Sequence, residues 1–158
     1  MHRWILAVSA VLMMATSAAA DAILTVVSGE SGEVLASYEL EDLDAFPQVT
    51  FETGNPFVDG TVQYSGPLMR DVLQSVRTPV DGTAVLELTA LNDYSIEFPV
   101  ADAINYDVIL ATRADGEVMS VRNKGPVWVM YPLDQNPELA SEDYQGRLIW
   151  QLARIELP

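Results

Sequence analysis

The sequence contains no cysteine and a single histidine, His2. These side chains are the ones most used for nucleophilic attack, soft-metal ligation and proton transfer near neutral pH. Serine hydrolase chemistry is also excluded, because no G-x-S-x-G motif and no histidine beyond His2 are present. Two-carboxylate glycosidase chemistry stays open among 23 acidic residues, although no pair stands out. Without disulfides, stability must come from a hydrophobic core, which a hydrophobic content of 49% permits.

Residues 1–20 have the features of a secretory signal peptide. His2 and Arg3 precede an apolar run over residues 4–15, and three alanines at 18–20 suit cleavage before Asp21. The run is short for a bilayer span, and an uncleaved anchor is the alternative. We therefore expect a periplasmic protein in which residues 21–158 form one domain, with no membrane insertion after cleavage.

Positive charge is scarce. Loss of Arg3 with the signal peptide leaves 7 of the 8 Lys and Arg against 23 Asp and Glu, a net charge of −16. Such a field repels nucleic acids and anionic lipid surfaces. Arg113, Arg122 and Lys124 nevertheless lie within twelve residues. They are either solvated side chains or a local positive spot for an anionic or carbonyl-rich ligand.

Alternating apolar residues and turn signals predict a domain made mostly of strands. A hairpin is expected over residues 22–38, a short helix over 40–46, and further strands over 48–52, 61–64, 84–91, 94–98, 108–113, 117–121 and 148–157. Residues 100–104 suit one helical turn. Trp150, within the last strand, is expected in the core.

Two further segments stand out. The first is a candidate for ligand contact, and the second is a candidate for a helix start. Residues 53–60 are dense in turn residues and include Phe57, so we expect a loop with an exposed aromatic ring. Ser65 and Pro67 suit the cap and first turn of a helix that ends before Pro79.

Residues 123–133 combine a turn with flat aromatic side chains. Gly125 permits a close backbone approach, Pro126 fixes the chain, and Trp128 and Tyr131 offer broad surfaces for a planar ligand. The alternative interpretation is a buried strand in which Trp128 fills the core.

Several short motifs, taken together, resemble a known family. They are YSGPLMRDVL at residues 64–73, NDY at 92–94, RADG at 113–116, KGP at 124–126, YP at 131–132 and WQL at 150–152. In order and spacing they are similar to the oxidoreductase molybdopterin-binding domain, the sulfite-oxidase fold. The resemblance implies an α+β, β-rich domain with a few short helices and a pterin pocket built from loops.

The resemblance also locates a missing ligand. In the family's enzymes a cysteine thiolate binds molybdenum about a dozen residues before the glycine that is Gly66 here. That place corresponds to residues 53–55, Thr-Gly-Asn, which cannot supply a soft thiolate. Bound molybdenum is therefore not expected, and the resemblance favours a binding protein over an enzyme.

Short exported relatives of this domain resemble periplasmic pterin-binding signalling proteins that work with a membrane-bound receptor such as a cyclic-di-GMP enzyme or a sensor kinase. A pterin or molybdopterin-like ligand is the implied cofactor. The residues predicted to contact the ligand are Thr53, Asn55, Phe57, Tyr94, Arg113, Lys124, Gly125, Trp128 and Tyr131. Asn55 or Asp59 would bind the amino edge of the ring, Arg113, Arg122 or Lys124 its carbonyl, and the aromatic residues its face.

Two alternatives remain at this point. One is a molybdopterin-dependent oxidoreductase or accessory subunit that holds the cofactor without a thiolate. The other is a structural or protein-interaction domain whose pocket is filled by side chains.

Overall fold

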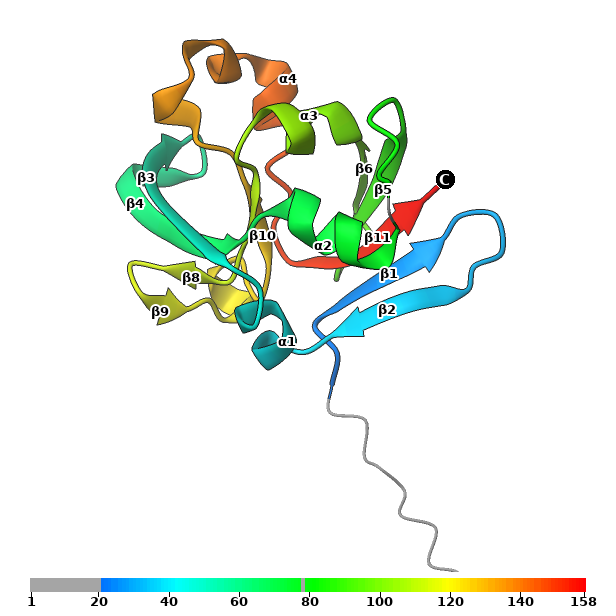
Figure 1. Cartoon of the computed structure of the whole chain (residues 1–158). Helices are drawn as coiled ribbons and strands as arrows, with labels where there is room; N and C mark the ends of the chain where they lie inside the picture. Colours follow the sequence, from blue (N-terminus) through cyan, green and yellow to red (C-terminus); the bar gives the residue numbers. More distant parts are fainter. Residues whose placement is uncertain (1–20, 78) are drawn as a thin grey trace, which may run out of the picture.

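The computed structural model describes residues 21–77 and 79–158 (Figure 1). The predicted signal peptide, residues 1–20, lies outside the described residues. The eleven strands of the described part form three sheets. Its helices are short, and none of them is long and apolar enough to cross a membrane.

The first sheet has five strands in the order β2-β1-β11-β5-β6. Its strands are β1 (Leu24–Ser28), β2 (Val34–Tyr38), β5 (Val85–Ala90), β6 (Ser95–Pro99) and β11 (Leu152–Leu157). The two ends of the described chain meet here, because β1 pairs with β11 in parallel, whereas the other pairs are antiparallel. Alternating side chains of these strands enter the core, as expected for a sheet with one covered face.

The second sheet has the order β3-β4-β8-β9, and the third pairs β10 with β7. Their strands are β3 (Gln48–Asn55), β4 (Val58–Pro67), β7 (Ile109–Ala111), β8 (Arg113–Ala114), β9 (Glu117–Val118) and β10 (Trp128–Met130). Gly66 in β4 allows β7 to approach closely, because a Cβ atom at this position would collide with the Leu110 carbonyl. The two sheets are thereby brought into direct contact.

Four α-helices and three 3-10 helices complete the described part. They are α1 (Leu40–Asp44), α2 (Met69–Val76), α3 (Val100–Asn105), α4 (Glu142–Gln145), η1 (Val121–Asn123), η2 (Leu133–Gln135) and η3 (Pro137–Ala140). Helices α2 and α3 pack together and lie over the five-stranded sheet, while η2, η3 and α4 form one excursion between β10 and β11 (Figure 1). One hydrophobic cluster joins α2 and α3 to all three sheets.

Most predicted elements are confirmed: the hairpin over 22–38, the short helix after it, the alternating strand at 94–98 and the helical turn near 100. The predicted loop at residues 53–60 is wrong, since β3 and β4 continue through it and leave only a tight turn at residues 56–57. Ser65 and Pro67 are not a helix start either. Both belong to β4, where the Ser65 carbonyl accepts a hydrogen bond from the Thr112 N–H, and α2 begins at Met69.

Candidate ligand-binding cleft

An open cleft of about 400 Å³ lies where three connecting segments meet. These segments are the β3–β4 turn, the β5–β6 turn and the chain between α4 and β11. The lining residues are Phe57, Ala90, Asn92, Tyr94, Gln145, Gly146, Leu148, Ile149 and Trp150. The lining is mostly apolar with a few amide groups, which is the usual composition of a small-molecule site.

Three aromatic side chains form the exposed walls of the cleft. Phe57 and Trp150 contact each other edge to face with ring centroids 4.9 Å apart, and Tyr94 belongs to the β5–β6 turn. Their exposed fractions are 41%, 37% and 58%, which is high for large aromatic residues. Two of the predicted site residues, Phe57 and Tyr94, are therefore brought together on one cleft.

Lys124 lies behind the Trp150 wall. Its ammonium nitrogen is 5.5 Å from the centroid of the Trp150 ring and 5.7 Å from that of Trp128, so both indoles make cation–π contacts with it. Gly125 is placed as predicted for a close backbone approach, since a Cβ atom there would collide with the Met119 carbonyl. Neither residue lines the cleft, and Lys124 is linked to it only by its contact with Trp150.

Trp128 and Tyr131 are buried, so the alternative interpretation of their segment is the correct one. Trp128 is 2% exposed and its indole N–H donates to the Leu148 carbonyl at 2.9 Å. The Tyr131 hydroxyl donates to the Asp102 carboxylate at 2.7 Å, and burial together with this carboxylate raises the pKa of Tyr131 well above its ordinary value. Neither ring can stack on a ligand in the cleft.

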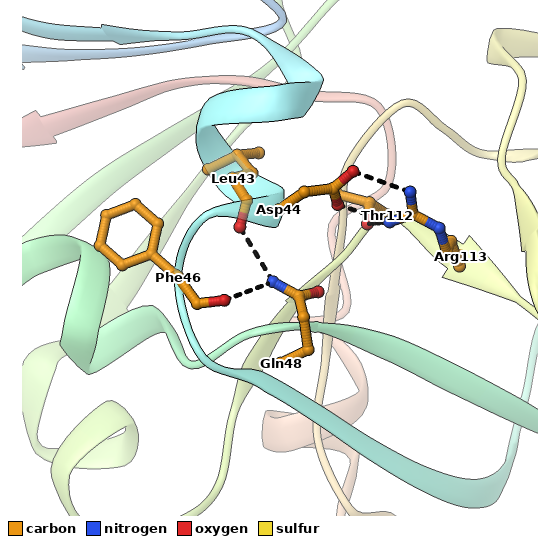
Figure 2. Close-up of polar contacts among 6 residues, drawn as sticks. All are labelled: Leu43, Asp44, Phe46, Gln48, Thr112 and Arg113. Carbon is orange, nitrogen blue, oxygen red and sulfur yellow. Dashed lines mark hydrogen bonds and ion pairs between the residues drawn. The ribbon is translucent and has the colours of Figure 1, made fainter.

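Arg113 is engaged away from the cleft. Its guanidinium forms a bidentate ion pair with Asp44, the last residue of α1, and also donates to the Thr112 hydroxyl (Figure 2). The Gln48 amide closes the turn after α1 by donating to the carbonyls of Leu43 and Phe46 (Figure 2). The hydrogen bond from Arg113 lowers the pKa of Asp44, and that of Arg113 is raised in return. The predicted carbonyl-binding role of Arg113 does not fit this position.

Thr53 and Asn55 shape the end of the β3–β4 hairpin. The buried Thr53 hydroxyl donates to the Gly54 carbonyl and accepts from the Asp134 N–H, while the Asp134 carboxylate accepts from the Gly54 N–H. The Asn55 amide donates to the Tyr64 hydroxyl, and its oxygen accepts from the Phe57 N–H. Both side chains are thus occupied by local structure, and Asn55 contributes indirectly by fixing the turn that carries Phe57.

Of the lining residues, only Phe57 and Tyr94 were predicted to contact the ligand, and three of the others have side chains that matter for the site. Trp150 was predicted to lie in the core, but β11 begins only at Leu152 and the ring lies at the surface instead. Asn92 was expected in a turn and as part of the NDY motif but not as a ligand contact, and Gln145 ends α4, in an excursion that the sequence pattern did not predict. The WQL motif at residues 150–152 was the one signal that pointed toward Trp150.

A comparison with protein families matches residues 17–134 to the model described as the oxidoreductase molybdopterin binding domain. This range covers well over half of the chain. The chain belongs to this family. The matched range includes Phe57 and Tyr94 but ends before Gln145 and Trp150, so the wall formed by residues 145–150 lies outside it.

Among solved structures, the chain is similar to the sulfane dehydrogenase SoxCD from Paracoccus pantotrophus, with a TM-score of 0.61 and 17% sequence identity. The match covers 85% of this chain and 37% of that chain. It shows the sulfite-oxidase-like fold that the motifs predicted. A search among curated proteins finds no match.

The residues in and around the cleft fit the parts of a molybdopterin cofactor unequally. Aromatic faces and amide groups suit the pterin ring. No thiolate is available for the metal of the cofactor. Residues 53–55, where the resemblance places the metal ligand, contain no sulfur, and the Thr53 hydroxyl is occupied by hydrogen bonds. Within residues 21–77 and 79–158, no group of three or more His, Cys, Asp or Glu residues could hold a metal ion.

Proposed function

We propose that this protein is an exported, non-catalytic pterin-binding module that reports its ligand to a membrane-bound partner. The observation that carries the proposal is the open cleft walled by Phe57, Tyr94 and Trp150, in a domain of the molybdopterin-binding family whose chain contains no cysteine. The pocket expected around Trp128 and Tyr131 is filled by side chains, so the proposal rests on the neighbouring open cleft alone.

The cleft offers a pterin both stacking surfaces and ring-edge contacts. The exposed rings of Tyr94 and Trp150 can cover the faces of a flat heterocycle. The Asn92 amide oxygen accepts from the Tyr94 N–H, which leaves its NH₂ group to donate to a ring carbonyl. The Gln145 NH₂ group donates to the Ala140 carbonyl, which leaves its oxygen to accept from the amino edge of a pterin.

The charges around the cleft favour a pterin without a phosphate. None of the residues that line the cleft is charged. Within the described part of the chain, Arg70, Arg113, Arg147 and Arg154 are paired with carboxylates, and the Lys124 ammonium is placed over two indoles. A phosphate at this site would therefore have no cationic partner among the lining residues, in a protein with a strongly negative field.

The direct test is calorimetric titration of residues 21–158 with neopterin in its oxidised and dihydro forms. Saturable binding at one site per chain is expected. The absence of binding to either form would overturn the proposal.

The second candidate function, a molybdopterin-dependent oxidoreductase or accessory subunit, is favoured by the family match itself. Protein purified from its native compartment decides between the two. One molybdenum atom per chain by inductively coupled plasma mass spectrometry would establish the second candidate in place of the first.

The partner we propose is a membrane-bound receptor such as a cyclic-di-GMP enzyme or a sensor kinase, contacted in the periplasm. Because this protein is strongly acidic, we expect the receptor to contact it through a basic surface, since opposite charges accelerate association. Association with the receptor's periplasmic domain should slow as salt is raised from low to physiological ionic strength. A salt-independent association rate would contradict charge steering.

A further inference from the structure

One residue in the wall at 145–150 does not face the cleft. Gln145, Gly146, Leu148, Ile149 and Trp150 line it, whereas the Arg147 side chain extends away from it toward α3. Between the end of α4 at Gln145 and the start of β11 at Leu152 the chain has no regular helix or strand. The position of this wall must therefore depend on individual anchors.

Two of the anchors are hydrogen bonds to backbone carbonyls of the wall. The Trp128 indole N–H donates to the Leu148 carbonyl at 2.9 Å, and the Val129 N–H donates to the Ile149 carbonyl at 3.0 Å. Both come from β10, which lies inside the core. They fix the part of the wall that follows Arg147.

The third anchor is the Arg147 guanidinium itself. It donates to the Asp102 carboxylate at 2.7 Å, and the Tyr131 hydroxyl donates to the same oxygen at the same distance. The guanidinium also lies 5.1 Å from the centroid of the Tyr144 ring, which packs edge to face on Tyr131.

Several features make this anchor stronger than a surface ion pair. Asp102 is 7% exposed and belongs to α3, a rigid element that packs on α2. Burial disfavours the charged guanidinium, but the Asp102 carboxylate outweighs this effect, so the pKa of Arg147 stays above its ordinary value. Deleting one member of a charge pair that is removed from water is strongly destabilising, because the remaining charge is left without a partner.

We propose that Arg147 is a positioning residue for the ligand site: by pairing with Asp102 on α3, it holds the wall at residues 145–150 in the place where Trp150 and Gln145 can contact a bound ring. The role in ligand binding rests on the proposed function, whereas the role in holding the wall does not. Arg147 lies beyond residues 17–134, the range matched by the family model, whereas Asp102 lies within it.

The test compares Arg147→Met with a matched control, Arg113→Met, which also removes a guanidinium from a partly buried carboxylate pair but far from the cleft. In hydrogen–deuterium exchange without ligand, peptides covering residues 145–152 should exchange at least tenfold faster in Arg147→Met than in the wild type. They should be unchanged in Arg113→Met. The affinity for neopterin should fall about tenfold in Arg147→Met only, and Arg147→Lys should recover part of both losses.

Each outcome is decisive. Unchanged exchange at 145–152 in Arg147→Met overturns the inference, as does an equal loss of affinity in Arg113→Met. If Arg147→Met does not fold, Asp102→Asn, which weakens the same pair while keeping its shape, gives the same two readouts. Failure of neopterin to bind the wild type would overturn the proposed function and the ligand-binding role of Arg147, while the exchange result would still decide whether Arg147 holds the wall.

Discussion

Replacing Trp150 with leucine should weaken pterin binding while leaving the protein folded. Trp150 is 37% exposed and forms one wall of the cleft, with edge contacts to Phe57 at 4.9 Å and to Trp128 at 6.3 Å. Its indole makes no hydrogen bond within the described part of the chain. The side chain therefore offers a flat surface to a ligand and supports little of the core.

The expected magnitudes follow from these contacts. Stacking of a heterocyclic base on an aromatic side chain contributes about 1–3 kcal/mol. Its loss should weaken neopterin binding about 5- to 140-fold, because 1.4 kcal/mol corresponds to a factor of ten. The lost ring contacts and the lost cation–π contact with Lys124 should reduce the free energy of unfolding by about 1–2 kcal/mol.

Calorimetry with neopterin and urea unfolding of the same samples separate the two effects. Phe46→Leu is the matched control, since Phe46 makes a similar edge contact with Tyr38 at 6.0 Å but lies away from the cleft. The control should lose stability and keep its affinity. An affinity of Trp150→Leu within twofold of the wild type would refute the placement of the ring against Trp150.

Two further predictions concern charge. Neopterin should bind at least tenfold more tightly than neopterin 3′-phosphate by calorimetry, because the cleft lining has no charged side chain; equal affinities in the wild type would contradict this. The Asp44–Arg113 pair should add about 1 kcal/mol of stability at neutral pH, measured as the difference between the wild type and Asp44→Asn in urea unfolding. Because Arg113 lowers the pKa of Asp44, this difference is fully present above an unfolded-state pKa of about 3.9 and should be lost as the pH falls from there through the lower folded-state pKa; a difference that stays constant from about pH 7 to about pH 2 would show that it does not come from the ionised pair.

The parts of the fold that could be predicted from the sequence are those in which local pattern and tertiary environment agree. The hairpin over 22–38 and the strand at 94–98 combine alternation with turn residues at their ends, and both are present. The loop predicted at residues 53–60 is wrong because long-range strand pairing determines the structure there. Thr53 pairs with Val62 and Gly54 with Thr61, so the β3–β4 ladder overrides a composition typical of loops.

The site was predictable only where exposure follows from a turn. Phe57 and Tyr94 lie at hairpin turns, and their place on the cleft agrees with their local sequence. The core position expected for Trp150 is wrong, and for Trp128 a ligand-facing ring and a buried ring were both open, because hydrophobicity alone does not say which of two indoles faces water. The exposure of Trp150 follows from the backbone at Gln151. Its positive φ of 53° turns the chain just before β11 and leaves Trp150 outside the sheet.

Under the proposed function, the arrangement accounts for ring binding without a metal ligand. The place where the family's enzymes hold a thiolate corresponds to residues 53–55, and the Thr53 hydroxyl there bonds to backbone groups of Gly54 and Asp134. The stacking surface is built separately, by Phe57 at the tip of the hairpin and by Trp150 on the wall that Arg147 holds. Because no proposed stacking residue depends on a sulfur atom at residues 53–55, the absence of a thiolate there leaves the proposed ring-binding surface intact. Under the proposed function, the rings that the cleft accepts then depend on Asn92 and Tyr94 in the β5–β6 turn as well as on the wall at residues 145–150.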